Sequence, residues 1–416
     1  MLLLYRILIN LTLLVSPIII IFRILKKKEH PKRFLEKFGF FNKKKKPGKL
    51  IWFHGSSVGE ILSVMPLIEN LERKKNIKQI LLTSNTLSSS KVFNNFKLKK
   101  TNHQFFPIDS NFITKKFLNY WQPSLAVFIE SEIWPNMINN LKNKNTNVVL
   151  LNARITKKSY MRWKKISFFS RSIFEKFNIC LPQNDETKHY LKKLGAKKIK
   201  KLGNLKFSET TLKTLDKINK STKNFLNKKK ILFGAISTHS SEETFCAKIH
   251  SKLKKKYPNG ITIIIPRHIH RTATIKEEIE NSGLKVHLHN SNVKKIDINT
   301  DIYLVNVFGE TKSFLKICKI VFLGGSLIQH GGQNPLEAAR LGCKVIHGPN
   351  ISNFMEVYNL LKKNNISSQV NNLNNAKAII NKNLNNKYNY KKIAKRLNSI
   401  GNEVLIKNKK EISKYI

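Results

Sequence analysis

Short apolar runs that alternate with helical stretches constrain the fold of this chain more than any other feature. In the first half of the sequence these runs predict buried strands, and residues with helical periodicity lie between them. The strands are expected at Leu50–His54, Gln79–Thr83, Leu125–Ile129 and Asn147–Leu151. Strands that alternate with helices are typical of a parallel sheet covered by helices on both faces. The pattern therefore predicts the α/β class.

A second series of strands follows a change in composition. Ser208–Lys230 is rich in Lys, Thr and Asn and poor in apolar residues, which favours a domain boundary. The later strands are expected at Ile231–Ala235, Ile261–Ile265, Ile302–Val305, Ile320–Leu323 and Lys344–His347. We therefore predict two Rossmann-like domains that face each other across a cleft, residues 26–208 and residues 209–416. The helical pattern of Tyr390–Ile406 could pack on either domain.

The N-terminal stretch predicts a membrane anchor. Leu2–Phe22 is almost entirely apolar and long enough to cross a bilayer, and Arg23 and Lys26–Lys28 follow it without a cleavage pattern. Positive residues on that flank place the rest of the chain in the cytoplasm. We therefore expect residues 1–25 to be an uncleaved anchor. The alternative is a hydrophobic helix that lies on the membrane or docks on a domain.

Charge points to an anionic partner. The chain has 77 Lys and Arg residues against 25 Asp and Glu, a net charge of +52. Such a balance favours nucleic acid or an anionic membrane. The lysines are spread along the whole chain beside abundant Asn and Ile, which is as typical of a compositional drift of the genome as of a binding patch. No nucleic-acid-binding motif accompanies them, so we expect an anionic membrane rather than nucleic acid as partner. The aromatic and basic segment His30–Lys46 suits a membrane surface, or an amphipathic helix packed on the first domain.

The glycine-rich stretch from Val321 to Leu341 predicts an anion-binding loop. Glycine pairs at 324–325 and 331–332 follow an apolar strand, and Asn334 and Pro335 suit the N-cap and the first turn of a helix. The free N–H groups of such a turn usually face a phosphate. Glu337 would repel a phosphate, so we expect it to accept hydrogen bonds from sugar hydroxyls. A strand, two turns and a capped helix without a ligand remain the alternative.

Carboxylates follow two strands of the first half. Glu60 opens a helix after the first strand, where a carboxylate could take a proton from a bound hydroxyl or simply favour the helix dipole. Glu130 and Glu132 follow the third strand and could cap a helix or organise sugar hydroxyls. Because neither a metal-binding Asp-x-Asp pair nor a phosphate-loop lysine occurs, we predict a mechanism without a metal or another cofactor.

Two loops of the second half suit anions. Gly234–Glu243 is rich in small and hydroxylic residues, and Arg267 follows the strand at Ile261–Ile265. An arginine there could hold a carboxylate with two hydrogen bonds, or it could be solvated. The histidines at 268, 330 and 347 are each expected to be structural. Four widely spaced cysteines predict reduced core thiols.

Taken in order, these loops resemble the motifs of the 3-deoxy-D-manno-octulosonic acid (Kdo) transferase family. The motifs run from about Leu50 to Phe354: HGSSVGE, ESEIWPN, NARI, QN, GNLKF, STHSSEE, PRH, GGSL, GGQNPLEAA and GPNISNF. The resemblance implies the GT-B fold, transfer of Kdo from CMP-Kdo onto the lipid A precursor (lipid IVA), and a place on the cytoplasmic face of the bacterial inner membrane.

The resemblance also assigns roles to residues. It implies that Glu60 is the general base of an inverting displacement, and that Glu130 and Lys206 stabilise the transition state. The implied CMP site consists of Pro266, Arg267, Phe308, Gly309, Glu310, Asn334, Pro335, Leu336 and Glu337. Two other functions stay open: a GT-B transferase that uses a different nucleotide sugar, and a basic binder of membrane or nucleic acid without catalytic activity.

Overall fold

The chain forms two units, each built around one parallel sheet. The computed structural model describes residues 1–208, 218–289, 296–385 and 390–416. Unit 1 comprises Met1–Thr210 and Ile400–Ile416, and unit 2 comprises Thr211–Ser399. The helix α16 (Tyr390–Ile412) contains residues of both units, and the short helix η4 (Ser413–Tyr415) follows it.

Unit 1 contains a six-stranded sheet in the order β3-β2-β1-β4-β5-β6, with every described pair parallel. This is the strand order of a Rossmann fold. The strands are β1 (Leu50–His54), β2 (Gln79–Ser84), β3 (Thr101–Phe105), β4 (Leu125–Ile129), β5 (Asn147–Ala153) and β6 (Ile179–Pro182). The helices are α1 (Leu2–Leu25), η1 (Phe34–Phe38), α2 (Val58–Glu72), α3 (Leu87–Phe93), α4 (Asn111–Trp121), α5 (Pro135–Asn143), α6 (Lys157–Lys165), α7 (Ser167–Phe174), α8 (Asp185–Lys193) and η2 (Leu205–Ser208).

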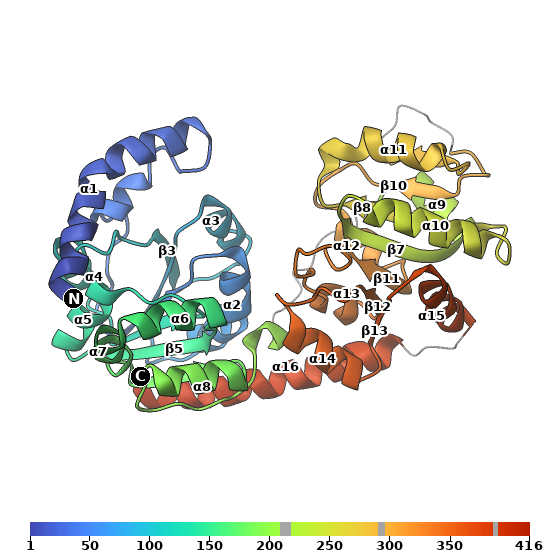
Figure 1. Ribbon diagram of the computed structural model, residues 1–416. Coiled ribbons are helices and arrows are strands. Elements are labelled where there is room, and N and C mark those ends of the chain that lie inside the picture. The colour runs from blue at the N-terminus through green and yellow to red at the C-terminus, as the bar shows by residue number, and fades with distance from the viewer. Residues whose placement is uncertain (209–217, 290–295, 386–389) are drawn as a thin grey trace. The chain divides into compact units, whose positions relative to one another are not determined.

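Unit 2 repeats this architecture with a seven-stranded sheet in the order β13-β12-β11-β7-β8-β10-β9 (Figure 1). Its described strand pairs are also all parallel. The strands are β7 (Lys230–Thr238), β8 (Gly260–Pro266), β9 (Val286–Leu288), β10 (Ile302–Leu304), β11 (Ile320–Leu323), β12 (Lys344–His347) and β13 (Ser367–Gln369). The helices are α9 (Lys220–Lys228), α10 (Glu242–Lys254), η3 (Ile269–Arg271), α11 (Thr272–Glu280), α12 (Thr311–Leu315), α13 (Leu336–Arg340), α14 (Met355–Lys363) and α15 (Leu373–Asn385). The prediction of two Rossmann-like α/β domains is confirmed.

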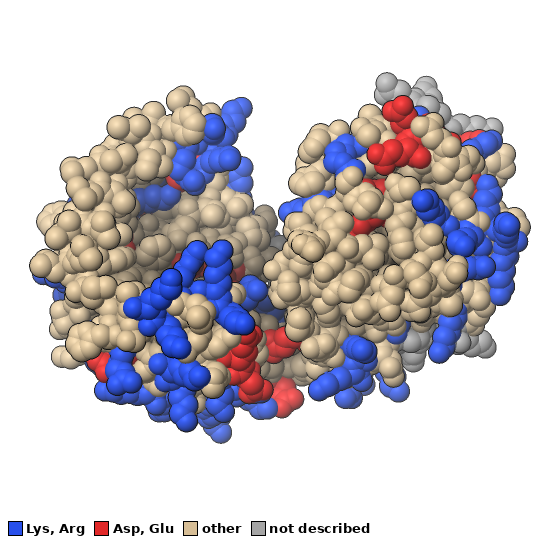
Figure 2. Space-filling view, in the orientation of Figure 1, with Lys and Arg blue, Asp and Glu red and all other residues tan. Residues whose placement is uncertain are grey.

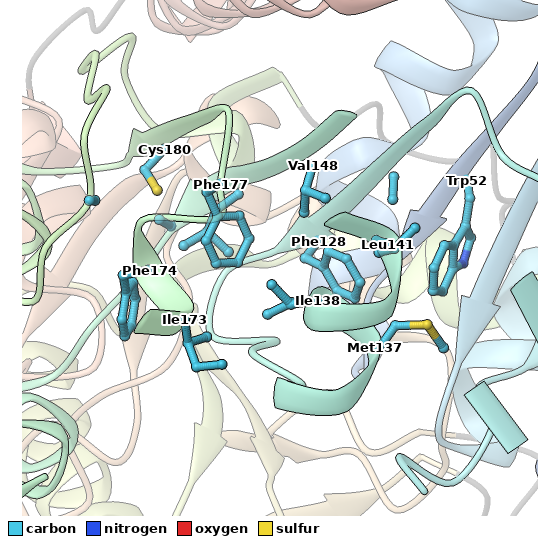
Figure 3. Close-up of a cluster of buried hydrophobic side chains, with 14 of the residues drawn as sticks. Trp52, Phe128, Met137, Ile138, Leu141, Val148, Ile173, Phe174, Phe177 and Cys180 are labelled. Carbon is cyan, nitrogen blue, oxygen red and sulfur yellow. The ribbon is translucent and has the colours of Figure 1, made fainter. Parts of the chain in front are cut away.

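Side chains on the two faces of the first sheet form separate cores. On one face, Trp52, Phe128 and Val148 pack against Met137 and Ile138 of α5 (Figure 3). The opposite face packs against α2. Strands that are covered on both faces require continuous apolar runs, which is why these strands were readable in the sequence.

One predicted boundary is wrong at its C-terminal end. Residues 400–416 were assigned to the second domain, but they belong to unit 1. Val404 and Ile412 are buried in the same core cluster as Leu205. Gly203 has a φ of 98°, and a Cβ there would lie 2.7 Å from Val404. The helix returns to unit 1 because its apolar face completes that core.

The predicted linker lies partly outside the described residues. Its boundary near residue 209 falls in the segment 209–217, which the structure does not describe. The remainder contains α9, which begins after Asn219; the Asn219 side chain accepts a hydrogen bond from the Thr222 N–H. This part is therefore a capped helix rather than an irregular connection.

Candidate active site

Glu60 lies one turn into α2, at the carboxyl end of β1. Ser57 caps this helix, and its Oγ accepts a hydrogen bond from the Glu60 N–H (3.3 Å). The Glu60 carboxylate accepts from the Ser57 hydroxyl (2.8 Å) and from the Ser56 N–H (2.6 Å). This reciprocal arrangement is a variant of the capping box in which the carboxylate accepts from the N–H of Ser56 rather than of the N-cap residue, and it fixes the orientation of the carboxylate.

The surroundings of Glu60 hold its pKa near neutrality. Burial is the largest cause, and the negative charge of Glu132 adds to it, so the pKa rises to about 7 despite the hydrogen bonds from Ser57 and Ser56. Glu130 contributes a smaller repulsion of the same sign. A carboxylate whose pKa lies close to the working pH is suited to general-base catalysis.

Glu130 forms a largely buried ion pair with Lys206. Lys206 Nζ lies 2.6 Å from Glu130 Oε1, and the two side chains are only 16% and 7% exposed. Glu130 has a positive φ of 56°. Its N–H donates to the carbonyl of Leu151, and its own carbonyl accepts from the Arg154 N–H. These bonds hold the strained residue at the junction of β4 and β5.

Buried asparagines fix the position of Lys206 in η2. Asn152 Oδ1 accepts from the Leu205 N–H (3.0 Å), and Asn204 Oδ1 accepts from the Lys206 N–H (3.0 Å). Asn152 and Asn204 are 1% and 4% exposed. They belong to the NARI and GNLKF motifs, so two short motifs far apart in sequence together position one ammonium group. Unit 1 thus brings Glu60, Glu130 and Lys206 to the same edge of its sheet.

A polar cluster beside these carboxylates was not predicted. The Glu132 carboxylate accepts from Trp134 Nε1 (2.9 Å), and its Oε2 lies 2.9 Å from His54 Nε2. His54 Nδ1 lies 3.0 Å from Thr83 Oγ1, and the ring stacks on Phe106. His54 and Trp134 stand inside the HGSSVGE and ESEIWPN motifs, which was the only signal available for them. Their contacts hold the Glu132 charge in place, and this charge adds to the larger effect of burial in raising the pKa of Glu60.

In unit 2, the glycine-rich loop holds an anion that belongs to the protein. The fully buried carboxylate of Glu242 accepts hydrogen bonds from the N–H groups of Gly325 (2.7 Å), Ser326 (3.0 Å) and Leu327 (2.9 Å). It also accepts from the His239 N–H (2.9 Å). The N–H groups directly after this strand are therefore occupied by a carboxylate of the protein, and the predicted phosphate site is left with the first turn of the helix that follows.

The helix after the second glycine pair is short. α13 begins at Leu336, one residue later than predicted, and Asn334 Oδ1 accepts a hydrogen bond from the Leu336 N–H (3.1 Å). The N-cap is therefore Pro335 and not Asn334 as predicted, although the Asn334 side chain still binds the first N–H of the helix. Asn334 and Glu337 are exposed, whereas Pro335 and Leu336 are buried. Of these four residues, only Asn334 and Glu337 have side chains that a ligand could reach.

Histidines gather above the same loop. The ring of His239 lies 4.5 Å from that of His330 and 5.7 Å from that of His268. Among the described residues, the buried Nε2 of His239 has no hydrogen-bond partner. Burial is the main cause that lowers the pKa of His239, followed by the charge of His330. The sequence reading took His330 as structural and did not single out His239, because three separate loops bring these rings together.

The other predicted donor-binding residues lie at the ends of β8 and β10. Arg267 follows β8 with its side chain exposed, and its N–H donates to the Thr238 carbonyl. Phe308 is 72% exposed, and Gly309 has a φ of 85°. Glu310 Oε2 lies 2.9 Å from His289 Nε2. His289 Nδ1 lies 2.7 Å from the Tyr303 hydroxyl, and that hydroxyl lies 3.2 Å from Thr222 Oγ1.

Comparison with known proteins agrees with this architecture. The family model described as 3-Deoxy-D-manno-octulosonic-acid transferase (kdotransferase) matches residues 32–209. A 3-deoxy-D-manno-octulosonic acid transferase of Rickettsia bellii is 36% identical over 336 residues, which cover 80% of this chain and 79% of the relative. One from Haemophilus influenzae is 28% identical over 418 residues, 98% of this chain and 96% of the relative.

A solved structure shows the same fold without close sequence similarity. The UDP-GlcNAc 2-epimerase of Neisseria meningitidis, bound to UDP-GlcNAc, has a TM-score of 0.55 at 15% identity over 86% of this chain and 100% of that one. Two Rossmann-like units with such neighbours establish the GT-B fold. The family resemblance of the ordered motifs is confirmed by relatives that cover most of the chain. The protein is therefore a glycosyltransferase, and it belongs to the 3-deoxy-D-manno-octulosonic acid transferase family.

Proposed function

We propose that the protein transfers Kdo from CMP-Kdo to lipid IVA during lipopolysaccharide biosynthesis, by a single inverting displacement without a metal ion. The observation that carries this proposal is the Glu60 carboxylate, whose pKa is raised to about 7, on the same sheet edge as the Glu130–Lys206 ion pair. Kdo is proposed as the transferred sugar because the chain belongs to the Kdo transferase family.

In the proposed reaction, Glu60 takes the proton from the acceptor hydroxyl. The hydroxyl oxygen then forms a bond to the anomeric carbon of Kdo while the bond from that carbon to the phosphate oxygen of CMP breaks. CMP leaves with the electron pair of the broken bond. Because the proposed reaction uses a base and forms no covalent intermediate with the enzyme, it is a single displacement, which inverts the configuration at the anomeric carbon.

The Glu130–Lys206 pair is proposed to stabilise the charge that develops in this step. The Lys206 ammonium can offset negative charge on the departing phosphate, and Glu130 orients it. Their burial strengthens this effect, since a fixed charge in a site with little water acts more strongly than the same charge in bulk water.

Unit 2 is proposed to bind CMP through the loops at the ends of β8, β10 and β11. Arg267 has an exposed guanidinium for the phosphate, and the exposed ring of Phe308 can stack on the base. Glu310 and Glu337 are proposed to accept hydrogen bonds from ribose hydroxyls. Pro266, Gly309, Asn334, Pro335 and Leu336 complete the proposed donor site.

The acceptor is a lipid, so we propose that the enzyme works at the cytoplasmic face of the inner membrane. The helix α1 is long and apolar enough to anchor it, and three lysines follow at 26–28. Lys and Arg side chains are distributed over the visible surface of each unit (Figure 2). Such a surface favours an anionic membrane and an acceptor that carries phosphates.

The direct test incubates the purified full-length protein with CMP-Kdo and lipid IVA in the presence of a chelator. Mass spectrometry should find lipid IVA that has gained Kdo. As a control for the nucleotide, CMP should protect the protein against thermal unfolding more than UDP does. Protein that is stabilised by CMP but forms no Kdo-bearing lipid would overturn the proposed acceptor, and protection by UDP alone would overturn the donor.

A further inference from the structure

The helix α1 is attached to unit 1 at both of its ends. Near its N-terminus, the Tyr5 hydroxyl donates to Asp109 Oδ2 (2.8 Å) and Arg6 Nε donates to Asn136 Oδ1 (3.0 Å). The Tyr5 ring also lies 6.3 Å from that of Phe169 in α7. Figure 1 shows this end of α1 beside α4 and α5.

The partners of Tyr5 and Arg6 are firmly built into the domain. Asp109 is 2% exposed, and its carboxylate also accepts from the N–H groups of Asn136 (3.0 Å) and Met137 (2.8 Å), which open α5. One carboxylate thus joins the first turn of α1 to the first turn of α5. Asn136 is fully buried.

The other end of α1 is held by a second carboxylate. Glu29 is 2% exposed and forms ion pairs with Arg23 of α1 (3.3 Å) and with Lys37 of η1 (2.5 Å). The Lys37 carbonyl in turn accepts from the Ile108 N–H, one residue before Asp109 in sequence. Tyr5 and Arg23 lie about 27 Å apart along the helix, at a rise of 1.5 Å per residue.

Between these ends, one stripe of α1 is turned toward the protein. The residues with reduced exposure recur every three or four positions, as expected for one face of a helix. They are Leu2, Tyr5, Arg6, Ile9, Leu13, Ser16, Ile20, Arg23 and Ile24. The opposite face carries large apolar side chains that are at least half exposed. These include Leu3, Ile7, Leu14, Ile18, Phe22 and Leu25.

A helix that crosses a bilayer could not keep these contacts. The hydrocarbon core is about 30 Å thick, so a spanning α1 would place Tyr5 and Arg23 on opposite sides of the membrane. Tyr5 contacts Asp109, and Arg23 is linked through Glu29 to Lys37. All of these partners belong to unit 1, which cannot lie on both sides of a membrane at once. From this contradiction we infer that α1 does not span the membrane: it lies along unit 1, and its exposed face inserts into one leaflet.

The occupant of this face is a bilayer surface that carries negative charge. Lys26, Lys27 and Lys28 are exposed at the end of the apolar face, and Lys26 Nζ lies 4.2 Å from the centre of the Phe22 ring. Apolar side chains that end in a row of cations are the pattern of a helix lying in the membrane interface. The inference rests on the proposed membrane location and replaces a spanning anchor by an in-plane one.

The test is the side of the membrane on which the N-terminus lies. A cysteine is added in a short polar extension before Met1 of the full-length protein, in which the four native cysteines are all buried. A membrane-impermeant maleimide is then applied to right-side-out and inside-out bacterial membrane vesicles. Lys28→Cys in the native chain marks the side of the catalytic units. The inference predicts that both cysteines react only in inside-out vesicles.

The outcomes separate the in-plane helix from the proposed function. Labelling of the N-terminal cysteine in right-side-out vesicles only would show a spanning helix and overturn the inference, as would recovery of the protein without membrane. If the N-terminus reacts on the far side while the protein still transfers Kdo, the proposed function stands and only the in-plane helix fails. If the N-terminus reacts on the side of the catalytic units but the protein transfers no Kdo, the in-plane helix stands and the proposed function fails.

A second measurement tests the docking contacts themselves. The double variant Tyr5→Phe, Arg6→Leu removes both bonds but keeps the apolar bulk, and Asn10→Leu on an exposed position of the same helix is the control. In detergent, amide hydrogen exchange in the first turns of α1 should become at least tenfold faster in the double variant than in the control. Equal exchange rates in the two proteins would show that these contacts do not hold α1 on unit 1.

Discussion

Lys206 Nζ lies 2.6 Å from Glu130 Oε1, in a place where neither side chain has much access to water. Removing one member of such a pair leaves a buried charge without compensation, which costs about 3–5 kcal/mol. We therefore expect Lys206→Met to lower the free energy of unfolding by about this amount, as measured by denaturant titration. The control is Lys197→Met, because Lys197 is 75% exposed and should contribute about 1 kcal/mol or less.

The double variant Glu130→Gln, Lys206→Met separates stability from catalysis. Without either charge, the free energy of unfolding should return to within about 1 kcal/mol of the native value, while Kdo transfer stays at least 100-fold below it. Recovery of transfer together with stability would show that the pair serves only the fold.

Glu60 should control the dependence of transfer on pH. A base acts in its deprotonated form, and the pKa of Glu60 is raised to about 7, so kcat/KM should rise with pH through about 7 and reach a plateau above it. Glu60→Gln should keep its affinity for CMP and lose transfer by about 100- to 10,000-fold. A rate profile that is flat from pH 5 to pH 8 would remove Glu60 from this role.

The same raised pKa has a consequence for stability. The folded protein binds the Glu60 proton more tightly than the unfolded chain does. The contribution of this group to folding is therefore greatest below the unfolded pKa and declines as the pH rises to about 7. The fall in the free energy of unfolding between pH 5 and pH 7 should be smaller in Glu60→Gln than in the native protein.

Glu242 should be required for the structure of unit 2. Its carboxylate accepts four backbone hydrogen bonds with two oxygens, whereas a glutamine amide offers only one accepting oxygen. Since each bond to a charged group contributes about 1.5–3 kcal/mol, Glu242→Gln should lower the free energy of unfolding by about 3 kcal/mol or more. Circular dichroism during thermal unfolding measures this. Glu277→Gln in the neighbouring helix α11 is a control with the same chemical change.

His289 should influence CMP binding without touching CMP. It holds the Glu310 carboxylate at 2.9 Å and is itself held by Tyr303. In His289→Leu, Glu310 loses this restraint, and calorimetry should show a Kd for CMP raised by about tenfold, or about 1.4 kcal/mol. Tyr303→Phe keeps the ring and removes only the hydroxyl, so its effect should be smaller. A Kd unchanged in both variants would place Glu310 outside the donor site.

The central strands could be predicted from the sequence, whereas the strands at the sheet edges could not. β3, β6, β9 and β13 lie at the edges of the two described sheets, and none of them was foreseen. Thr101–Phe105 contains Asn, His and Gln, and Ser367–Gln369 contains no apolar residue. An edge strand pairs on one side only and is often short, so its side chains show a weaker hydrophobic pattern.

The site could be predicted where its chemistry is local. Ser57 and Glu60 have the spacing of a capping box, so the place of Glu60 at a helix start was readable. The role of Glu242 could not be predicted, because its partners Gly325–Leu327 lie more than 80 residues later in the sequence. In addition, no local pattern distinguishes a glycine loop that binds phosphate from one that binds a carboxylate of the protein. The contact between Tyr5 and Asp109 was hidden for the same reason.

The return of residues 400–416 to unit 1 determines the order in which the protein can mature. Val404 and Ile412 belong to the core of unit 1, yet the ribosome makes them only after all of residues 211–399. Domains usually complete folding from the N-terminus as the chain emerges. Unit 1 is synthesised first, but its core can be completed only after residues 400–416 have been made. During that interval its incomplete core and the apolar face of α1 are available to chaperones or to the membrane.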